Sequence, residues 1–148
     1  MKKVIAAIVL LVLMASCEKK ELMDDNILNG TYAKKFHIIH YKTIPMYDVD
    51  KNSFQILSFD YAKDKNHVYF GDEEIKNADL ATFELVGEYF SKDNNHVYYR
   101  ENILEGADPK SFVRLGSVEA GKYYRDKKKI YNREGKALGI DVRVYKLI

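Results

Sequence analysis

Hydrophobic and polar positions recur along the chain with a period of 29 residues. The segments 61–87 and 90–116 align at this offset without a gap, and ten of their 27 aligned positions are identical. A fixed period of this length indicates a small unit that cannot bury its apolar face alone and stacks on copies of itself. The identical pairs are Lys63/Lys92, Asp64/Asp93, Asn66/Asn95, His67/His96, Val68/Val97, Tyr69/Tyr98, Ala78/Ala107, Asp79/Asp108, Phe83/Phe112 and Gly87/Gly116.

A second motif follows in each copy: a small residue, Asp, two variable positions, Ser or Thr, and Phe. It occupies residues 49–54, 78–83 and 107–112. The first copy matches poorly at its start, and the last begins after an insertion of four residues and ends before this motif returns. Incomplete end copies are typical of capping units. We assign the repeats to residues 32–60, 61–89 and 90–118, with a partial copy at 123–148.

Each copy predicts strands joined by tight turns. Residues 83–92 are rich in strand-forming side chains, and 97–99 return as a second strand after the turn 93–96, where Asp and Asn bond to their own backbone. A third short strand is expected at 103–104. Residues 108–111 predict a single helical turn, with Asp108 as its N-cap and Pro109 at the first helical position.

The predicted fold class is therefore all-β. Tandem strand-turn-strand repeats of about 29 residues should form one continuous meandering or solenoid-like sheet, preceded by a signal-peptide helix. We expect the core to contain Phe54, Ile56, Val68, Ile75, Phe83, Leu85, Val97, Leu104, Phe112 and Leu115.

The first residues of the chain predict export and lipidation. Lys2 and Lys3 precede an apolar run over 4–14, which is too short to span a membrane as a helix. Ala15 and Ser16 then lead directly into Cys17, the only cysteine, in an arrangement that resembles a bacterial lipoprotein signal. We predict a signal peptide over 1–16, a lipidated tether over 17–30 that begins at Cys17, and a repeat domain over 31–148.

Removing residues 1–16 changes the charge balance. It takes away two lysines and no acidic residue, so 22 basic side chains remain against 22 acidic ones. A chain without a net basic charge lacks the electrostatic field that nucleic-acid binding requires, and we expect no nucleic-acid partner. The expected location is the bacterial cell envelope, on the periplasmic or the surface face of the outer membrane.

The motifs at 63–70 and 92–99, Lys-Asp-Lys-Asn-His-Val-Tyr-Phe and Lys-Asp-Asn-Asn-His-Val-Tyr-Tyr, resemble those of the DKNYY family of bacterial repeat proteins. The second motif at 78–83 and 107–112 matches the same family. The resemblance covers residues 55–135 closely and 32–54 loosely. It implies a repeat protein of the envelope, in a family that includes many lipoproteins, and it implies no activity.

The candidate ligand-contact residues are the recurring His67, Tyr69, His96 and Tyr98, together with Tyr131. Residues two apart on a strand share a face, so stacked copies would align Tyr69, Tyr98 and Tyr131 in a column that binds sugars or peptide. The alternative is that these tyrosines only stabilise neighbouring strands, which we weight more heavily.

Other chemistry finds little support in the sequence. His37, His40 and the repeat histidines come with no carboxylate cluster for a metal site. The calcium-loop-like start at 48–52 has Ser53 where Gly is needed and Phe59 where the bidentate Glu belongs. Neither a nucleophile elbow nor a phosphate loop occurs. We expect no metal, no cofactor and no catalytic residue.

The predicted function is a lipid-anchored, non-catalytic module of the cell envelope that binds a protein or a glycan. Its expected contact with the membrane is the N-terminal lipid. Two alternatives remain open: a structural spacer without a ligand, and a hydrolase whose site forms no recognisable motif.

Overall fold

The computed structural model describes residues 26–27, 31–116, 123–139 and 142. All regular elements within these residues are β-strands, which confirms the all-β prediction. The described residues contain no helix that is long and apolar enough to cross a membrane. The predicted signal-peptide helix, the lipidation site Cys17 and most of the tether lie outside the described residues. The chain divides into two compact units, residues 1–52 and 53–148.

The first unit contains one four-stranded antiparallel sheet, in which each strand pairs with the next along the chain. Its strands are β1 (Asn26–Ile27), β2 (Tyr32–Lys35), β3 (Ile38–Tyr41) and β4 (Ile44–Met46). Strands β2 to β4 belong to the predicted first repeat, whereas β1 lies before it, within the segment predicted as tether. This part of the chain therefore forms a four-stranded sheet although its sequence matches the other copies incompletely.

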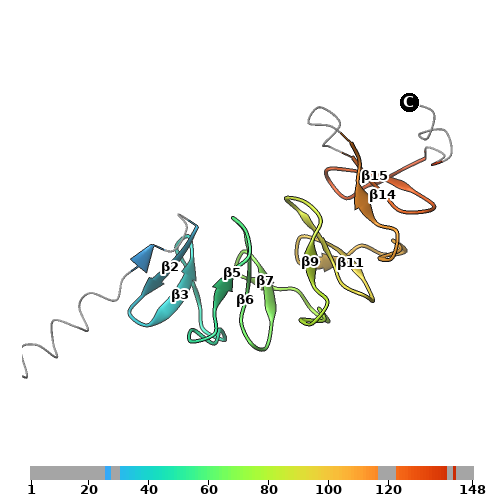
Figure 1. The fold of residues 1–148 in the computed structure, drawn as a ribbon. Helices are drawn as coiled ribbons and strands as arrows, with labels where there is room; N and C mark the ends of the chain where they lie inside the picture. Colours follow the sequence, from blue (N-terminus) through green and yellow to red (C-terminus); the bar gives the residue numbers. More distant parts are fainter. Residues whose placement is uncertain (1–25, 28–30, 117–122, 140–141, 143–148) are drawn as a thin grey trace, which may run out of the picture. The chain divides into compact units, whose positions relative to one another are not determined.

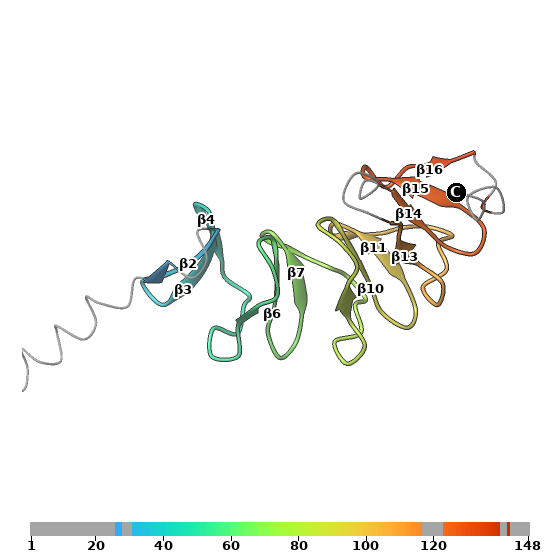
Figure 2. The same ribbon diagram turned by 45° about the horizontal axis from the view of Figure 1, so that its top comes forward.

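The second unit contains three sheets of the same four-stranded antiparallel form, one for each remaining repeat (Figures 1 and 2). The first is formed by β5 (Gln55–Ile56), β6 (Tyr61–Lys63), β7 (Val68–Phe70) and β8 (Glu73–Glu74). The next contains β9 (Glu84–Leu85), β10 (Phe90–Lys92), β11 (Val97–Tyr99) and β12 (Asn102–Ile103). The last contains β13 (Val113–Arg114), β14 (Tyr123–Arg125), β15 (Ile130–Asn132) and β16 (Ala137–Leu138).

The repeats thus form separate small meanders and not the one continuous sheet expected from the sequence. The outer strands of each sheet in the second unit have only two residues, and no strand of one sheet pairs with a strand of another. Residues 108–111 form a hydrogen-bonded turn, in which the Ser111 N–H donates to the Asp108 carbonyl over 3.2 Å. The helical turn expected there is not continued into a helix.

Two hydrophobic clusters join successive repeats of the second unit. Tyr61, Val68 and Ile75 of one repeat enclose Tyr98 of the next. The second cluster combines Phe90, Val97 and Phe112 with Tyr124 and Tyr131 of the last repeat. Because each cluster takes side chains from two repeats, neither repeat could bury its apolar face without its neighbour.

A close contact between repeats depends on Gly87. The Tyr124 ring packs on Phe90, with ring centroids 4.0 Å apart, and lies nearly parallel to Phe112. A Cβ atom at Gly87 would lie 2.1 Å from the Tyr124 hydroxyl and 2.9 Å from its ring. The absence of a side chain at this repeated position therefore leaves the room that Tyr124 occupies.

The predicted core is confirmed in part. Val68, Ile75, Val97 and Phe112 are buried, and the other predicted core residues are half-buried except one. Leu85 is 37% exposed, because it lies on the two-residue edge strand β9. The sequence did not identify the largest buried side chains, which are mostly tyrosines: Tyr32, Tyr61, Tyr98 and Tyr131.

We predict that Phe112→Ala lowers the free energy of unfolding by about 3–5 kcal/mol, since it empties the centre of the second cluster. Val113→Ala, at the next and exposed position, should change it by less than about 0.5 kcal/mol. Urea unfolding followed by tyrosine fluorescence measures both, since the chain has 12 Tyr and no Trp. Equal losses in the two variants would contradict this description of the core.

Candidate functional site

A buried aspartate begins the central hairpin turn of each repeat in the second unit. Asp64, Asp93 and Asp126 are between 0% and 4% exposed. In each case the Oδ1 atom accepts hydrogen bonds of 2.7 Å from the backbone N–H groups two and three residues further along the chain. The carboxylate therefore holds the turn closed, and this explains why Asp recurs at this position.

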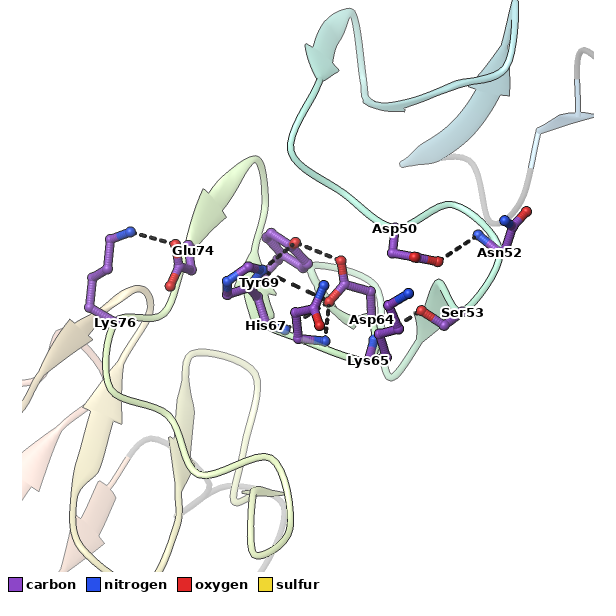
Figure 3. A network of polar contacts seen from close by, with 10 residues as sticks. Asp50, Asn52, Ser53, Asp64, Lys65, His67, Tyr69, Glu74 and Lys76 are labelled. Atoms are coloured by element: carbon purple, nitrogen blue, oxygen red, sulfur yellow. Dashed lines mark hydrogen bonds and ion pairs between the residues drawn. The ribbon is translucent and has the colours of Figure 1, made fainter.

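The second carboxylate oxygen binds a tyrosine of the following strand. The Tyr98 hydroxyl donates to Asp93 Oδ2 over 2.8 Å, and Tyr131 donates to Asp126 over 3.0 Å. The same bond joins Tyr69 to Asp64 over 2.9 Å, as Figure 3 shows. The Asp and the Tyr of the first motif thus form one hydrogen-bonded pair within each hairpin.

The same oxygen also joins neighbouring repeats. Asp93 Oδ2 accepts a 2.8 Å bond from the backbone N–H of Asp79, and Asp126 Oδ2 accepts a 3.1 Å bond from that of Asp108. Asp79 and Asp108 are the aspartates of the second motif in the preceding repeat. The two motifs therefore recur together because each repeat's first motif binds the second motif of the repeat before it.

The Ser or Thr of the second motif completes this link. The Thr82 hydroxyl donates to Asp79 Oδ2 over 2.7 Å and accepts a 3.2 Å bond from the Asn94 N–H. Ser111 binds Asp108 and the Lys127 N–H in the same way. A hydroxyl group is required here because it both donates and accepts, which explains the restriction to Ser or Thr.

This geometry corrects the predicted ligand-contact column. Tyr69, Tyr98 and Tyr131 are at most 4% exposed, and their hydroxyls are bound to aspartates. Their rings cannot offer a face to a ligand. They stabilise the repeats instead, as the alternative interpretation expected. His67 and His96 remain half-exposed beside them, each with Nδ1 3.4 Å from the tyrosine hydroxyl of its own hairpin.

A different group of aromatic side chains is half-exposed, at the other end of the hairpins. Tyr89 contacts both Phe70 and Tyr99 edge to face, with ring centroids 6.3 and 6.5 Å away. The Arg100 guanidinium lies 5.1 Å from the Tyr89 ring and 5.5 Å from the Tyr99 ring. Arg133 lies over Tyr89 at 5.2 Å. We call these five residues the aromatic–arginine row.

Arg133 is held in this row by two polar contacts. Its Nη2 atom donates to Glu88 Oε2 over 2.8 Å and to the Tyr89 hydroxyl over 3.3 Å. Because Arg133 belongs to the last repeat and Tyr89 to the junction before β10, the row crosses from one repeat to another. Alternation along the strand could have indicated this face, since Phe70 and Tyr99 point away from Tyr69 and Tyr98.

The chain belongs to the DKNYY family. The family model matches residues 32–89, 76–135 and 90–148, which confirms the resemblance and covers all the repeats. No curated protein and no solved structure matches the chain significantly. The Asp and Tyr positions that recur in this DKNYY protein are the buried pair that closes each hairpin. Membership of the repeat family fits a non-catalytic repeat module.

Arg100 has an unusual backbone conformation in this DKNYY protein. Its φ of 55° lies in the left-handed region, where a side chain other than that of glycine is uncommon. The equivalent residues of the first two repeats are Lys42, with a φ of 55°, and Gly71, with a φ of 63°. The Arg100 N–H donates to the Tyr89 carbonyl, and the Gly71 N–H donates to the Asp60 carbonyl, each over 2.8 Å. Both bonds lie at the end of the hairpin opposite its turn. The first and third repeats thus keep a long basic side chain where glycine would fit without strain.

Hydrogen bonding sets the ionisation of the buried aspartates. Burial alone raises the pKa of Asp93, but bonds from the N–H groups of Asp79 and His96, the Tyr98 hydroxyl and the Asn95 N–H lower it below its ordinary value. The pKa of Asp126 is lowered in the same way, against the effect of burial. Conversely, burial and the bond to Asp93 raise the pKa of the Tyr98 hydroxyl, which keeps it protonated as a donor.

Metal binding has no visible site in the described part of the chain. No group of three or more His, Cys, Asp or Glu side chains lies close enough there to hold an ion. Cys17 lies outside this part. The expectations of no metal, no cofactor and no catalytic residue stay predictions.

We predict that Asp93→Asn lowers the free energy of unfolding at neutral pH by about 2–4 kcal/mol, because an amide –NH₂ cannot accept the bonds that one carboxylate oxygen accepts. The folded pKa of Asp93 is below that of the unfolded chain. Its contribution is therefore present above about pH 4 and is lost as the pH falls through the folded pKa.

The difference between wild type and Asp93→Asn should consequently shrink as the pH is lowered below about 4. Urea unfolding at several pH values measures it. Glu73→Gln removes a carboxylate from an exposed position of the preceding repeat and serves as the control. A difference that stays constant down to pH 2 would show that the Asp93 carboxylate is not stabilised in its ionised form.

Proposed function

We propose that this DKNYY protein is a lipid-anchored, non-catalytic module of the bacterial cell envelope, which binds a protein or a glycan through the aromatic–arginine row. The lipid anchor is supported by Cys17 directly after an apolar signal-like segment. Repeat-family membership supports a module built of equivalent units. The row takes the place of the tyrosine column, whose members are buried.

The arrangement of the row carries this proposal. Half-exposed rings of Phe70, Tyr89 and Tyr99 lie beside the exposed guanidinium groups of Arg100 and Arg133. An aromatic ring offers an apolar face with a polar edge, and an adjacent guanidinium adds up to five hydrogen-bond donors. Sugar rings and peptide side chains both bind to surfaces of this composition, and Tyr and Arg are enriched in binding hot spots.

The strained backbone at Arg100 supports the same conclusion. A side chain in the left-handed region costs about 1–2 kcal/mol, and such strain is concentrated at functional positions. The contacts of Arg100 to Tyr89 and Tyr99 offset about 0.5–1 kcal/mol of this cost, since both are partly exposed. Folding alone would therefore favour glycine here, as at Gly71 in the repeat before it. The first repeat nevertheless has Lys42 at the same φ of 55°, with its ammonium 4.7 Å from the Tyr41 ring, so a cation beside an aromatic ring recurs at this position.

A spacer without a ligand is the second candidate, and a separate observation favours it. The recurring residues of both motifs are used in bonds within or between repeats, as with Asp93, Tyr98 and Thr82. A protein whose recurring pattern only joins its units needs no partner to explain that pattern. The two candidates differ at positions outside the motifs, of which Arg100 is the clearest.

We predict that Arg100→Gly leaves the free energy of unfolding within about 1 kcal/mol of wild type, because the loss of strain and the loss of ring contacts nearly cancel. Ligand binding should weaken by at least about tenfold, equivalent to 1.4 kcal/mol. Binding is measured on an array of defined glycans and a panel of purified envelope proteins. Lys128→Ala, on the exposed turn of the last repeat, is the control.

Two outcomes of this experiment would count against the proposal. Unchanged binding in Arg100→Gly would remove the row as the contact surface. A wild-type protein that binds nothing on either panel would favour the spacer. A screen of the same protein against hydrolase substrates tests the remaining alternative, the hydrolase without a recognisable motif.

Lipid anchoring has its own test. Cys17→Ser should abolish incorporation of labelled palmitate in bacterial cells and release the protein from the membrane fraction, because the thiol is the acylated group. Met14→Leu, which brings the segment closer to the usual lipoprotein signal, should leave labelling intact. Labelling that persists in Cys17→Ser would refute the anchor, since the chain has one Cys.

A further inference from the structure

Two cavities in residues 53–148 are formed by the same positions of successive repeats. One, of about 280 Å³, is lined by Ser53, Gln55, Lys63, Asp64, Lys65 and Leu80. The other, of about 310 Å³, is lined by the six positions 29 residues further along the chain and by Lys110. A cavity that recurs with the period of the sequence is a property of the repeat. Differences between its two copies therefore show how each is specialised.

In the second cavity, the lysine ammonium is fully bound within the protein. Lys92 Nζ lies 3.1 Å from Glu84 Oε1 and donates to the carbonyls of Pro109 and Phe112 over 3.1 and 3.3 Å. An ammonium group has three N–H donors, and these three acceptors therefore satisfy all of its hydrogen bonds. The Lys92 side chain is only 17% exposed. Glu84 supplies the negative charge at this site.

The first cavity has the same lysine and no such carboxylate. Gln55 stands opposite Lys63 in the strand register, as Glu84 stands opposite Lys92. Gln55 therefore occupies the position equivalent to Glu84 but carries no charge. Within the part of the chain that the structure describes, Lys63 Nζ makes no hydrogen bond or ion pair, although the residue is half-buried.

We infer that the Lys63 cavity binds a carboxylate group of another molecule, in the place that the Glu84 carboxylate occupies one repeat later. A partly desolvated ammonium without a counter-ion is costly, and a carboxylate that enters the cavity relieves this cost. The occupant is a Glu or Asp side chain of an acidic peptide segment, because the group that fills the equivalent cavity is itself a Glu side chain on a strand.

This site is distinct from the aromatic–arginine row and goes beyond the proposed function. Lys63 and Lys92 are the last residues of β6 and β10, next to the hairpin turn. The row gathers around residues that precede β10 or follow β11, at the opposite end of the hairpin. The cavity can therefore be tested with the row intact, and failure of either site leaves the other unaffected.

The exchange of Gln55 and Glu84 provides a matched pair of variants. An acetylated and amidated triglutamate peptide is titrated into the ¹⁵N-labelled full chain, solubilised in a nonionic detergent, with triglutamine as the uncharged control. Wild type should show saturating shifts of the amide signals at Ser53 and Lys63. Gln55→Glu should bind at least about tenfold more weakly, because its own carboxylate occupies Lys63. Glu84→Gln should gain a second set of shifts at Thr82 and Lys92.

Each result decides one part of the inference. Binding that is equally strong in wild type and Gln55→Glu would overturn it, as would a response to triglutamine as large as that to triglutamate. The absence of new shifts in Glu84→Gln would overturn the equivalence of the two cavities. Tighter binding of glucuronate than of triglutamate would overturn the assignment to a peptide. Arg100→Gly should bind triglutamate as wild type does, which separates this site from the proposed ligand-binding row.

Discussion

The fold of the second unit depends on a buried carboxylate that belongs to two repeats at once. Asp93 and Asp126 each accept two bonds from their own turn, one from a tyrosine of their own hairpin and one from the backbone of the preceding repeat. An ionised group is costly to bury unless all its acceptor sites are used, and here four donors converge on it. A repeat with its neighbour removed would leave one acceptor site unfilled and its apolar face exposed. Polar and apolar contacts therefore enforce the same stacking.

This constraint separates the recurring residues from those that can carry function. Asp, Tyr and the Ser or Thr of the second motif recur because a change at any one of them leaves a buried partner unsatisfied. The positions free to vary lie around this network, and they differ between copies in chemically meaningful ways. Gln55 faces Lys63 where Glu84 faces Lys92. Lys42, Gly71 and Arg100 differ in side chain at one equivalent position of positive φ. Folding does not require either difference.

The sequence predicted what depends on local spacing. The repeat period, the all-β class, the turn at 93–96 and the buried positions Val68, Val97 and Phe112 follow from alternation and turn chemistry. The sequence failed where the answer depends on what covers a face. Alternation places Tyr69 and Phe70 on opposite faces but does not say which face meets the next repeat. Both faces are covered, because Val68, on the face of Phe70, packs with Tyr98 of the next repeat. The predicted contact column is therefore part of the core.

Comparison of the copies within one chain compensates for part of this limitation. Equivalent positions share backbone geometry, hydrogen bonds and burial, so a difference in side-chain chemistry between them is seen against a constant background. Lys92 shows what a lysine at this position binds when a carboxylate is available, with three acceptors within 3.3 Å. At the equivalent cavity, Lys63 faces Gln55 in place of that carboxylate. A repeat protein thus contains its own reference structure for each site. The positions at which the copies disagree, and not those at which they agree, are where binding specificity can evolve without cost to the stacked fold.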